Sequence, residues 1–324
     1  MKKFAHLSPK TMDEAVGFLS SYGEKAQVIA GGTDLLGVMK DEILPRYPEA
    51  LVNLKSIEGL DFIEAESGGL RIGALTRLDD IASSEVVRER YAALAEAALR
   101  CASPHIRAMG TLGGNICQDI RCWYYRNPQN RFPCLRKGGG RCYAIEGDNR
   151  YHSIFGGTVE KGCYAVHPSD MAPALIAFDA TIKTTRREVP VEEFFKTRVR
   201  KTTCLEPDEI VTEIVLPALP AGTRSHFIKF AIRKSIDFPI VNCASMVTSE
   251  GGRVKNARVC LNAVYVKPYR AKQAEETIIG KTIDEESAAA AGEAIIADTR
   301  PMSRNAYMVQ VARTLVKRTL LASR

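Results

Sequence analysis

Four cysteines lie within one stretch of the chain that is otherwise rich in glycine and arginine. They are Cys122, Cys134, Cys142 and Cys163, with the spacing C-x11-C-x7-C-x20-C. Four thiolates on a mostly irregular segment can surround a metal centre, because loops allow all four sulfurs to point inward. Both iron–sulfur clusters and structural zinc take four such ligands. The stretch has no C-x-x-C pair, the usual mark of zinc. The spacing therefore favours a [4Fe–4S] cluster, with structural zinc and unligated thiols as the alternatives.

The composition is that of an ordinary soluble globular protein, with 45% hydrophobic and 26% charged residues. A chain of 324 residues is long enough for two or three domains. No apolar run approaches the roughly 20 residues of a membrane span, and polar residues interrupt the N-terminus where a secretory signal would be apolar. We therefore expect a cytoplasmic protein without membrane attachment, whose cysteines are reduced or metal-bound. Four cysteines occur in helix or strand patterns and are expected in the core: Cys101, Cys204, Cys243 and Cys260.

Positive charge is concentrated around the four clustered cysteines. The net charge is +7, and the stretch from Cys117 to Val166 holds eight Lys and Arg against four Asp and Glu. No recognition helix or aromatic–basic motif accompanies this charge, so no nucleic-acid partner is expected. The charge can instead neutralise an anionic cluster, form a solvated face, or steer an acidic, ferredoxin-like electron carrier to the surface. The docking interpretation places the carrier against Arg126, Arg131, Arg136, Lys137 and Arg141.

The order of the apolar patterns predicts an α+β protein in three parts. We expect a small α/β unit at residues 1–55, a second α/β unit at 56–217 with the cysteine-rich insertion at about 117–166, and a C-terminal domain at 218–324. We predict strands at 26–30, 51–54, 70–74, 181–185 and 209–216, and helices at 78–83, 86–101 and 169–178. In the C-terminal domain we predict a three-stranded antiparallel sheet, at 225–232, 241–248 and 254–264, and helices at 271–279, 285–297 and 304–321.

Two glycine-rich turns follow apolar strands. The first is Ala30-Gly31-Gly32-Thr33-Asp34-Leu35, and the second is Gly110-Thr111-Leu112-Gly113-Gly114-Asn115. Glycine lets a backbone approach a ligand closely, and consecutive backbone N–H groups can bind an anion. Neither turn is a G-x-G-x-x-G or a P-loop, and each alone is more typical of an ordinary tight turn. Together they could hold the pyrophosphate of a dinucleotide from two sides.

Two further motifs make a family resemblance specific. With HPSDMAPALIAFDA at 167–180 and FIKFAIR at 227–233, the two turns resemble the FAD-binding subunit of the xanthine oxidase family of molybdenum hydroxylases. The resemblance covers nearly the whole chain. It implies an FAD-binding domain of the vanillyl-alcohol oxidase (PCMH) type in two α/β subdomains, followed by the C-terminal domain. It also implies that the turns hold the FAD pyrophosphate, that Asp170 contacts the adenosine end and that Lys229 lies near the flavin. The expected FAD-binding residues are Ala30, Gly31, Gly32, Thr33, Asp34, Leu35, Thr111, Gly113, Gly114, Asn115, Asp170 and Lys229.

The cysteine-rich stretch departs from most of this family, because a long insertion separates Asn115 from Asp170. The chain therefore resembles a branch with a [4Fe–4S] cluster on the flavin subunit, which includes 4-hydroxybenzoyl-CoA reductases and bacterial aldehyde oxidoreductases. Of these two we favour 4-hydroxybenzoyl-CoA reductase, an enzyme of aromatic degradation that removes a phenolic hydroxyl reductively to give benzoyl-CoA. The resemblance implies Cys122, Cys134, Cys142 and Cys163 as iron ligands, with Cys117 as the substitute if one assignment is wrong.

The resemblance further implies an electron-transfer subunit of an oxidoreductase, with no catalytic residues of its own. The molybdenum cofactor and [2Fe–2S] clusters would belong to partner subunits, where the substrate is converted. A ferredoxin-like carrier would supply electrons to a dimer of heterotrimers. The alternatives are the flavin subunit of an aldehyde or xanthine-type oxidoreductase, a stand-alone flavin oxidase and, from another class, a zinc-stapled binding module. Visible absorption separates the last from the others, because flavins and iron–sulfur clusters are coloured and zinc is not.

Overall fold

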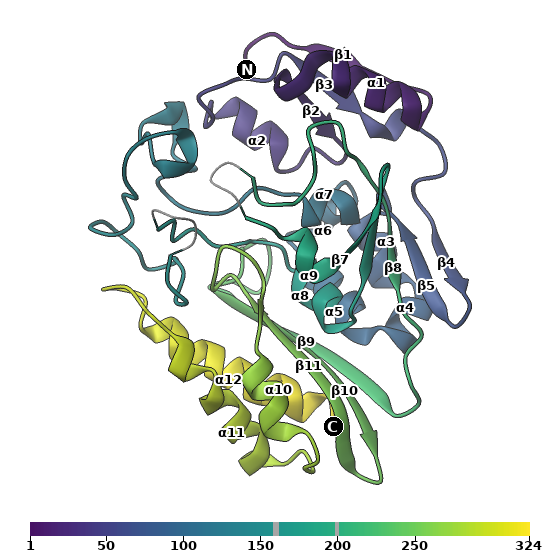
Figure 1. Cartoon of the computed structure of the whole chain (residues 1–324), viewed down its shortest axis with the longest axis vertical. Coiled ribbons are helices and arrows are strands. Elements are labelled where there is room, and N and C mark those ends of the chain that lie inside the picture. Colours follow the sequence, from purple (N-terminus) through teal and green to yellow (C-terminus); the bar gives the residue numbers. More distant parts are fainter. Residues whose placement is uncertain (158–161, 198–200) are drawn as a thin grey trace.

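The structure is a computed structural model, and it describes residues 1–157, 162–197 and 201–324. Within these residues, three sheets of three, five and four strands follow one another along the chain. Figure 1 shows the N-terminal sheet at the top, the five-stranded sheet in the middle and the four-stranded sheet below. The predicted α+β class is confirmed. The cysteine-rich stretch lies at the side of the molecule, between the N-terminal unit and the C-terminal helices (Figure 1).

The N-terminal unit contains a parallel sheet in the order β1-β3-β2. Helix α1 begins after Thr11, whose hydroxyl accepts a hydrogen bond from the backbone N–H of Glu14 at 3.2 Å. The helix buries Ala15 and Leu19 against the sheet. Strand β1 was not predicted, because three residues are too few to show an alternating pattern. The elements are β1 (Ala5–Leu7), α1 (Met12–Tyr22), β2 (Ala26–Ile29), α2 (Leu35–Lys40) and β3 (Ala50–Asn53), with single 3-10 turns at Gly23–Lys25 and Leu54–Ser56.

The five-stranded sheet is antiparallel throughout, in the order β4-β5-β8-β6-β7. Its strands are β4 (Ile63–Glu66), β5 (Gly69–Gly73), β6 (Thr181–Thr184), β7 (Glu188–Pro190) and β8 (Val211–Leu216). Strands β5 and β8 are hydrogen-bonded neighbours although the whole cysteine-rich stretch lies between them in the sequence. The chain therefore leaves this sheet to form the insertion and returns to the same sheet afterwards.

Helices cover this sheet, and one of them differs from the prediction. The helix predicted at 86–101 is two helices, because Tyr91 has a non-helical backbone, with φ −127° and ψ 51°. The Tyr91 ring is fully buried and meets the Phe178 ring edge-on, with centroids 5.2 Å apart. Its hydroxyl donates a hydrogen bond to the carbonyl of Pro217 at 2.7 Å. These tertiary contacts override the local helical pattern. The helices are α3 (Leu78–Ser83), α4 (Glu85–Arg90), α5 (Ala92–Arg100), α6 (Pro104–Arg107) and α7 (Leu112–Ile116).

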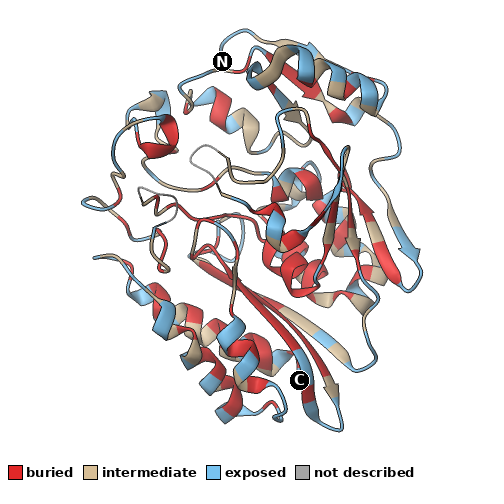
Figure 2. Cartoon of the chain, viewed as in Figure 1, coloured by how far each residue is buried: buried red, intermediate tan, exposed pale blue. Residues whose placement is uncertain are grey.

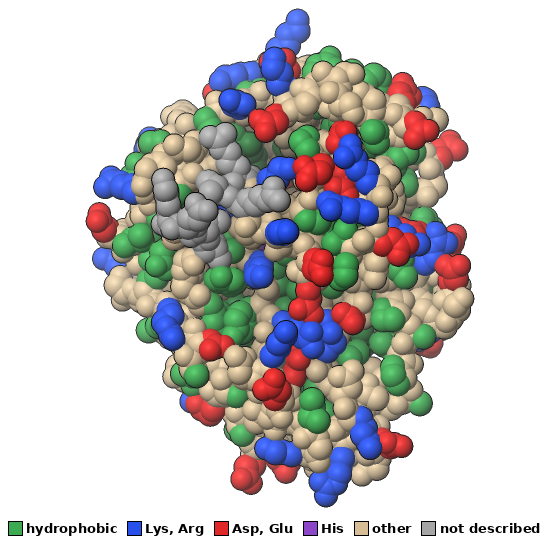
Figure 3. Space-filling model, in the orientation of Figure 1, with side chains coloured by type: hydrophobic (Ala, Val, Ile, Leu, Met, Phe, Trp, Pro, Cys, Tyr) green, Lys and Arg blue, Asp and Glu red, His purple; other side chains and the backbone are tan. Residues whose placement is uncertain are grey.

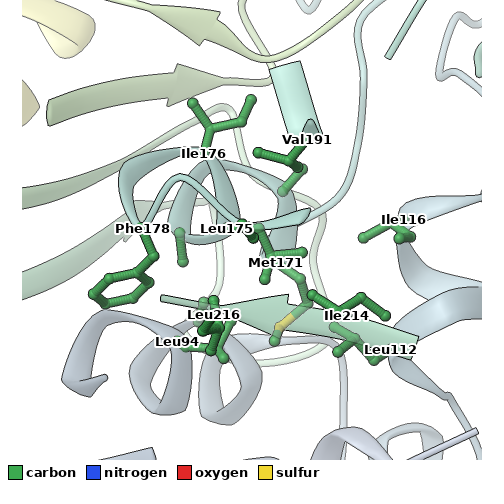
Figure 4. Close-up of a cluster of buried hydrophobic side chains, with 14 of the residues drawn as sticks. Leu94, Leu112, Ile116, Met171, Leu175, Ile176, Phe178, Val191, Ile214 and Leu216 are labelled. Atoms are coloured by element: carbon green, nitrogen blue, oxygen red, sulfur yellow. The ribbon is translucent and has the colours of Figure 1, made fainter. Parts of the chain in front are cut away.

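Helix α8 (Met171–Ala177) directly follows the cysteine-rich stretch, and all of its residues are buried. Figure 4 shows its Met171 and Leu175 side chains beside Leu94 of α5 and Leu216 of β8. Figure 2 shows buried residues concentrated in this region and along the sheets, with exposed residues at the helix surfaces. The end of the insertion is therefore anchored in the main core. The short helix α9 (Val191–Phe194) follows β7.

The C-terminal sheet is antiparallel, in the order β12-β11-β10-β9. We predicted three strands, and the fourth is the two-residue β12, which is too short for a sequence pattern. Helix α12 packs on β9 and β10, whereas α5 and α8 contact the other face of the sheet. Helices α5 and α8 therefore lie between the middle unit and this sheet. The predicted domain limits, after residues 55 and 217, stay a prediction. The elements are β9 (Thr223–Phe230), β10 (Val241–Glu250), β11 (Arg253–Asn262), β12 (Tyr269–Arg270), α10 (Lys272–Ile278), α11 (Glu285–Ala294), a 3-10 turn at Ile296–Asp298 and α12 (Tyr307–Ala322).

The cysteine-rich stretch is mostly irregular and has a small core, to which Val266 from outside the stretch also contributes. An antiparallel bridge between Arg121 and Val166 closes its two ends. Single 3-10 turns occur at Pro128–Asn130 and Leu135–Lys137. The buried members of its core are Ile120, Tyr125, Cys134, Cys163, Ala165 and Val266.

Across the described residues, no helix combines the length and the apolar character that a membrane crossing requires.

Candidate functional site

The two glycine turns lie directly against each other. A Cβ atom placed on Gly31 would stand 2.2 Å from the carbonyl oxygen of Met109 and 3.0 Å from the Cα of Gly110. Only glycine therefore allows the first turn to approach the second this closely. Gly32 has φ +70°, the left-handed region that glycine adopts most readily. The fold thus brings together the two turns that the sequence singled out.

Protein contacts hold the second turn in place. The buried Thr111 precedes α7, and its hydroxyl accepts a hydrogen bond from the Gly114 backbone N–H at 3.1 Å. A Cβ on Gly113 would stand 2.9 Å from the carbonyl oxygen of Ala74, so glycine permits the contact with the end of β5. Thr33 and Gly114 are exposed, one on each turn. The surface shared by the turns is therefore open to a ligand. In the first turn, Ala30 directly follows β2 and Leu35 begins α2.

The carboxylate of Asp34 is bound by protein groups, whereas Thr33 of the same turn is exposed. Its carboxylate accepts hydrogen bonds from Arg126 at 2.8 and 3.0 Å and from Arg121 at 2.7 Å. It also accepts one from the backbone N–H of Asp119 at 3.1 Å. Burial alone would raise the Asp34 pKa, but the charges of Arg126 and Arg121 outweigh it and lower the pKa. Asp34 therefore ties the glycine turn to the start of the cysteine-rich stretch.

Replacing Asp34 by asparagine is expected to destabilise the fold at neutral pH but not in acid. The lowered pKa means that the Asp34 charge stabilises the folded state above the unfolded pKa of about 3.9, and that this contribution is lost as the pH falls through the folded pKa. We expect a loss of about 2 kcal/mol at pH 7, typical of hydrogen bonds between charged groups. Urea unfolding of both proteins between about pH 7 and pH 2 measures the difference, which should shrink towards zero in acid. The exposed Asp13→Asn is the control, and a difference that is constant with pH would contradict the prediction.

Asp170 and Lys229 form a buried pair between the middle unit and the C-terminal sheet. The Lys229 ammonium donates to Asp170 Oδ2 at 2.7 Å and to the carbonyl of Arg100 at 3.0 Å. The amide of Asn242 donates to Asp170 Oδ1 at 2.7 Å. Burial raises the pKa of Asp170, and Lys229 partly offsets this rise. Asp170 was predicted at the adenosine end of FAD and Lys229 near the flavin, and in the structure their side chains are bound to each other.

A second set of contacts joins this pair to the glycine turn, and the sequence did not indicate it. The hydroxyl of Ser169 donates to Asn115 Oδ1, and Asn115 Nδ2 lies 3.4 Å from the sulfur of Cys101. Asn242 reaches Asp170 because its strand pairs Asn242 with Lys229. That register depends on the pairing of β9 with β10, which no local pattern specifies.

All four predicted iron ligands line a single cavity. Cys134 and Cys163 are buried, and Cys122 and Cys142 are half-buried. Burial raises the pKa of Cys122 to about 12, and the neighbouring thiols of Cys163 and Cys142 add to the rise. Four thiolates at this site therefore require a cationic partner. The cavity is lined by Cys122, Tyr124, Tyr125, Cys134, Leu135, Arg136, Cys142, Tyr143, Cys163 and Ala165.

These cysteines surround the cavity and do not converge on one point. In the part of the chain that the structure describes, no group of three or more His, Cys, Asp and Glu side chains is arranged to hold a single metal ion. Cys117, the predicted substitute ligand, is exposed at the end of α7 and does not line the cavity. Of the cysteines predicted in the core, Cys204 is half-buried and the other three are buried: Cys101, Cys243 and Cys260.

Several basic side chains of the stretch point inward, which corrects the predicted docking face. Lys137 is 7% exposed, and its ammonium has no hydrogen-bond partner among the described residues. It lies 5.5 Å from the centre of the Tyr125 ring, beside the cysteine cavity. Arg136 is also buried, and Arg126 binds Asp34. Of the five residues, only Arg131 and Arg141 are exposed.

Figure 3 shows Lys and Arg side chains interspersed with Asp and Glu over one face of the molecule, without a continuous basic area. Glu160 and Lys161, which contribute to the charge count of the stretch, lie outside the described residues.

The fold and the paired glycine turns are those expected of a flavoprotein with an additional C-terminal sheet, and comparisons identify its family. Residues 2–219 match the FAD binding domain in molybdopterin dehydrogenase, and residues 226–323 match the CO dehydrogenase flavoprotein C-terminal domain. The chain therefore belongs to the FAD-binding proteins of the molybdopterin dehydrogenases, which are components of oxidoreductases. Both the predicted fold and the resemblance to the molybdenum hydroxylase family are confirmed at this level.

Individual relatives cover almost all of the chain. The aldehyde oxidoreductase FAD-binding subunit of Escherichia coli is 34% identical over 92% of this chain and 92% of its own length. The carbon monoxide dehydrogenase medium chain of Hydrogenophaga pseudoflava is 30% identical over 99% of this chain and 97% of its own. A solved carbon monoxide dehydrogenase from H. pseudoflava, which lacks the Mo-pyranopterin moiety, superposes with a TM-score of 0.78, at 30% identity and 99% and 97% coverage.

Proposed function

We propose that the chain is the electron-transfer subunit of a molybdenum hydroxylase complex and binds both FAD and a [4Fe–4S] cluster. The observation that carries the proposal beyond the family is the cavity lined by Cys122, Cys134, Cys142 and Cys163. These residues span 42 positions of the sequence, counted from Cys122 to Cys163. The molybdenum cofactor, the [2Fe–2S] clusters and the substrate site would belong to partner subunits.

The chemistry of the cavity fits a cubane cluster. Each of the four iron atoms of a [4Fe–4S] cluster takes one thiolate, so its ligands surround a volume, as these four cysteines do. A cluster with four thiolates is anionic, and the buried Lys137 ammonium, unpartnered among the described residues, would offset that charge. The aromatic rings of Tyr124, Tyr125 and Tyr143 limit the access of water, which influences the reduction potential. When bound, the cluster supplies a one-electron site.

The paired turns fit the pyrophosphate of FAD. Their exposed parts, at Thr33 and Gly114, share one surface, and the backbone there can approach an anion closely. Asp170 and Lys229 are also proposed to bind FAD, and their buried contact joins β9 to the start of α8. We assign Asp34 a positioning role, because both of its carboxylate oxygens bind arginine. Within the two turns, the residues proposed to bind FAD directly are Ala30, Gly31, Gly32, Thr33, Leu35, Thr111, Gly113, Gly114 and Asn115. When bound, FAD supplies the exchange between two-electron and one-electron chemistry.

Two complexes are candidates for the substrate reaction. The sequence favoured 4-hydroxybenzoyl-CoA reductase, whereas the 34% identity to an aldehyde oxidoreductase subunit supports the aldehyde alternative. The chain itself offers no residue that distinguishes them, since the substrate site is proposed on another subunit. A ferredoxin-like carrier, if used, has only Arg131 and Arg141 left of the predicted docking face. Assembly as a dimer of heterotrimers and a cytoplasmic location are further proposals.

Purification of the intact complex tests the proposal. An affinity-tagged chain expressed in its native host should bring down two partner subunits, which contain molybdenum and [2Fe–2S] clusters. Acid precipitation of the purified chain should release about one FAD, because the flavin is proposed to be bound without a covalent link. Oxidation of aromatic aldehydes would identify one candidate reaction, and reduction of 4-hydroxybenzoyl-CoA the other. A chain that oxidises a substrate alone, without partners, would instead be a stand-alone flavin oxidase.

A further inference from the structure

The imidazole of His152 lies against one of the proposed iron ligands. Its Nε2 atom is 3.2 Å from the sulfur of Cys122, within hydrogen-bonding distance. His152 is 1% exposed, so water does not compete for this contact. The other ring nitrogen, Nδ1, is buried and has no hydrogen-bond partner in the residues that the structure describes. Among the described residues, the sulfur of Cys122 is therefore the polar partner of the His152 ring.

The C-terminal domain holds His152 in this position. The side chain of Asn305, fully buried before α12, donates to the carbonyl of His152 at 2.8 Å and to that of Ser153 at 3.1 Å. The backbone N–H of His152 donates to the carbonyl of Asn149 at 3.1 Å. Asn149 is itself bound by the backbone N–H of Arg304, at 2.9 Å. Contacts from two separate parts of the chain thus fix the backbone from which the imidazole extends.

The direction of the hydrogen bond follows from the nature of the two atoms. A sulfur that binds iron carries negative charge and accepts hydrogen bonds, so the nitrogen that faces it is favoured as the donor. An Nε2–H group satisfies this requirement in the neutral ring and in the protonated ring alike. Donation to a ligand sulfur stabilises the more negative, reduced form of a cluster and raises its reduction potential.

We propose that His152 is a positioning residue that donates a hydrogen bond from Nε2 to the sulfur of Cys122 and raises the reduction potential of the cluster. This inference rests on the proposed function, because it requires the cluster. The redox step takes one electron from an external reductant into the cluster. It breaks no bond and transfers no proton from His152. Through Asn305, the C-terminal domain contributes to the setting of the potential.

Redox titration of the purified holo-subunit, followed by the EPR signal of the reduced cluster, tests the proposal. His152→Phe removes the N–H but keeps a buried ring, and should leave the iron content unchanged while moving the potential to a more negative value. His152→Gln retains a side-chain N–H donor and should restore part of the shift. His105→Phe, at an exposed histidine of α6, is the matched control and should change nothing. An unchanged potential in an iron-replete His152→Phe protein would overturn the inference and leave the proposed function intact.

A spectroscopic measurement on the unmutated protein covers the case in which the variants lose iron. With 15N-histidine incorporated, the reduced cluster should show hyperfine coupling to one labelled nitrogen, which only a histidine beside the cluster can supply. The absence of this nitrogen coupling in protein with a full cluster would also overturn the inference. Unmutated protein that contains no iron would overturn the proposed function, and this inference with it.

Discussion

Replacement of Cys134 by serine is expected to reduce the iron content from about four atoms per chain to nearly none. Cys134 is buried in the lining of the cavity, where a serine oxygen is a much poorer iron ligand than a thiolate. The same loss is expected for serine at Cys122, Cys142 and Cys163, because each would leave one iron atom without its ligand. Iron and sulfide analysis of the purified variants, with the visible spectrum, measures the effect.

Three other cysteines provide matched controls for this experiment. Cys204→Ser and Cys260→Ser should retain iron, since neither residue lines the cavity. Cys117→Ser should also retain it. Iron loss in this variant, with retention in Cys163→Ser, would show that Cys117 is the fourth ligand. One zinc per chain and no iron in the unmutated protein would instead support the zinc-stapled binding module.

Replacement of Gly31 by valine is expected to abolish FAD binding. The new Cβ would stand 2.2 Å from the carbonyl oxygen of Met109. Because this oxygen belongs to the backbone, the clash cannot be relieved by moving a flexible side chain. The two turns would be forced apart, which separates the two halves of the proposed pyrophosphate site. We expect the flavin content to fall from about one per chain to nearly none. The flavin released by acid, measured against protein, gives the result.

Gly37 is the matched control for Gly31. It lies in α2, a few residues after the turn, and a Cβ there would meet nothing within 4 Å. Gly37→Ala should keep the flavin and raise the free energy of unfolding by about 0.5 to 1 kcal/mol, the usual gain in a helix. A Gly31→Val protein that is folded and binds FAD normally would contradict the proposed site.

Some elements can be recognised from their own residues, whereas others depend on distant contacts or are too short to recognise. The strands at 70–74 and 241–248 and the helix at 169–178 were recognisable, because each one is a largely apolar segment that the fold buries. The helix predicted at 86–101 divides at Tyr91, whose hydroxyl bonds to Pro217. No local pattern could indicate a partner that lies 126 positions away. Strands β1 and β12 are too short to produce a pattern at all.

In the candidate site, the residues were identified from the sequence, but the contacts that they make were not. Both glycine turns were identified from their residues, but their contact through Gly31 and Met109 appears only in the fold. Asp34 was predicted in the FAD site, and the structure adds that its carboxylate binds Arg126, 92 positions away. The basic residues of the insertion were predicted on a docking face, and Arg136 and Lys137 are buried.

The sequence by itself determined the class of fold, the two glycine turns and the four cysteines that are candidate iron ligands. These features depend on residue type and on spacing over a few positions, where backbone conformation and apolar periodicity are decided. Only the tertiary structure decided that the four cysteines line one cavity, that Asp170 binds Lys229 and that His152 faces Cys122. Burial, ion pairing and hydrogen bonding of these side chains require contacts between residues that are distant in the sequence. Strand register and helix packing determine those contacts, and neither can be derived from a local pattern.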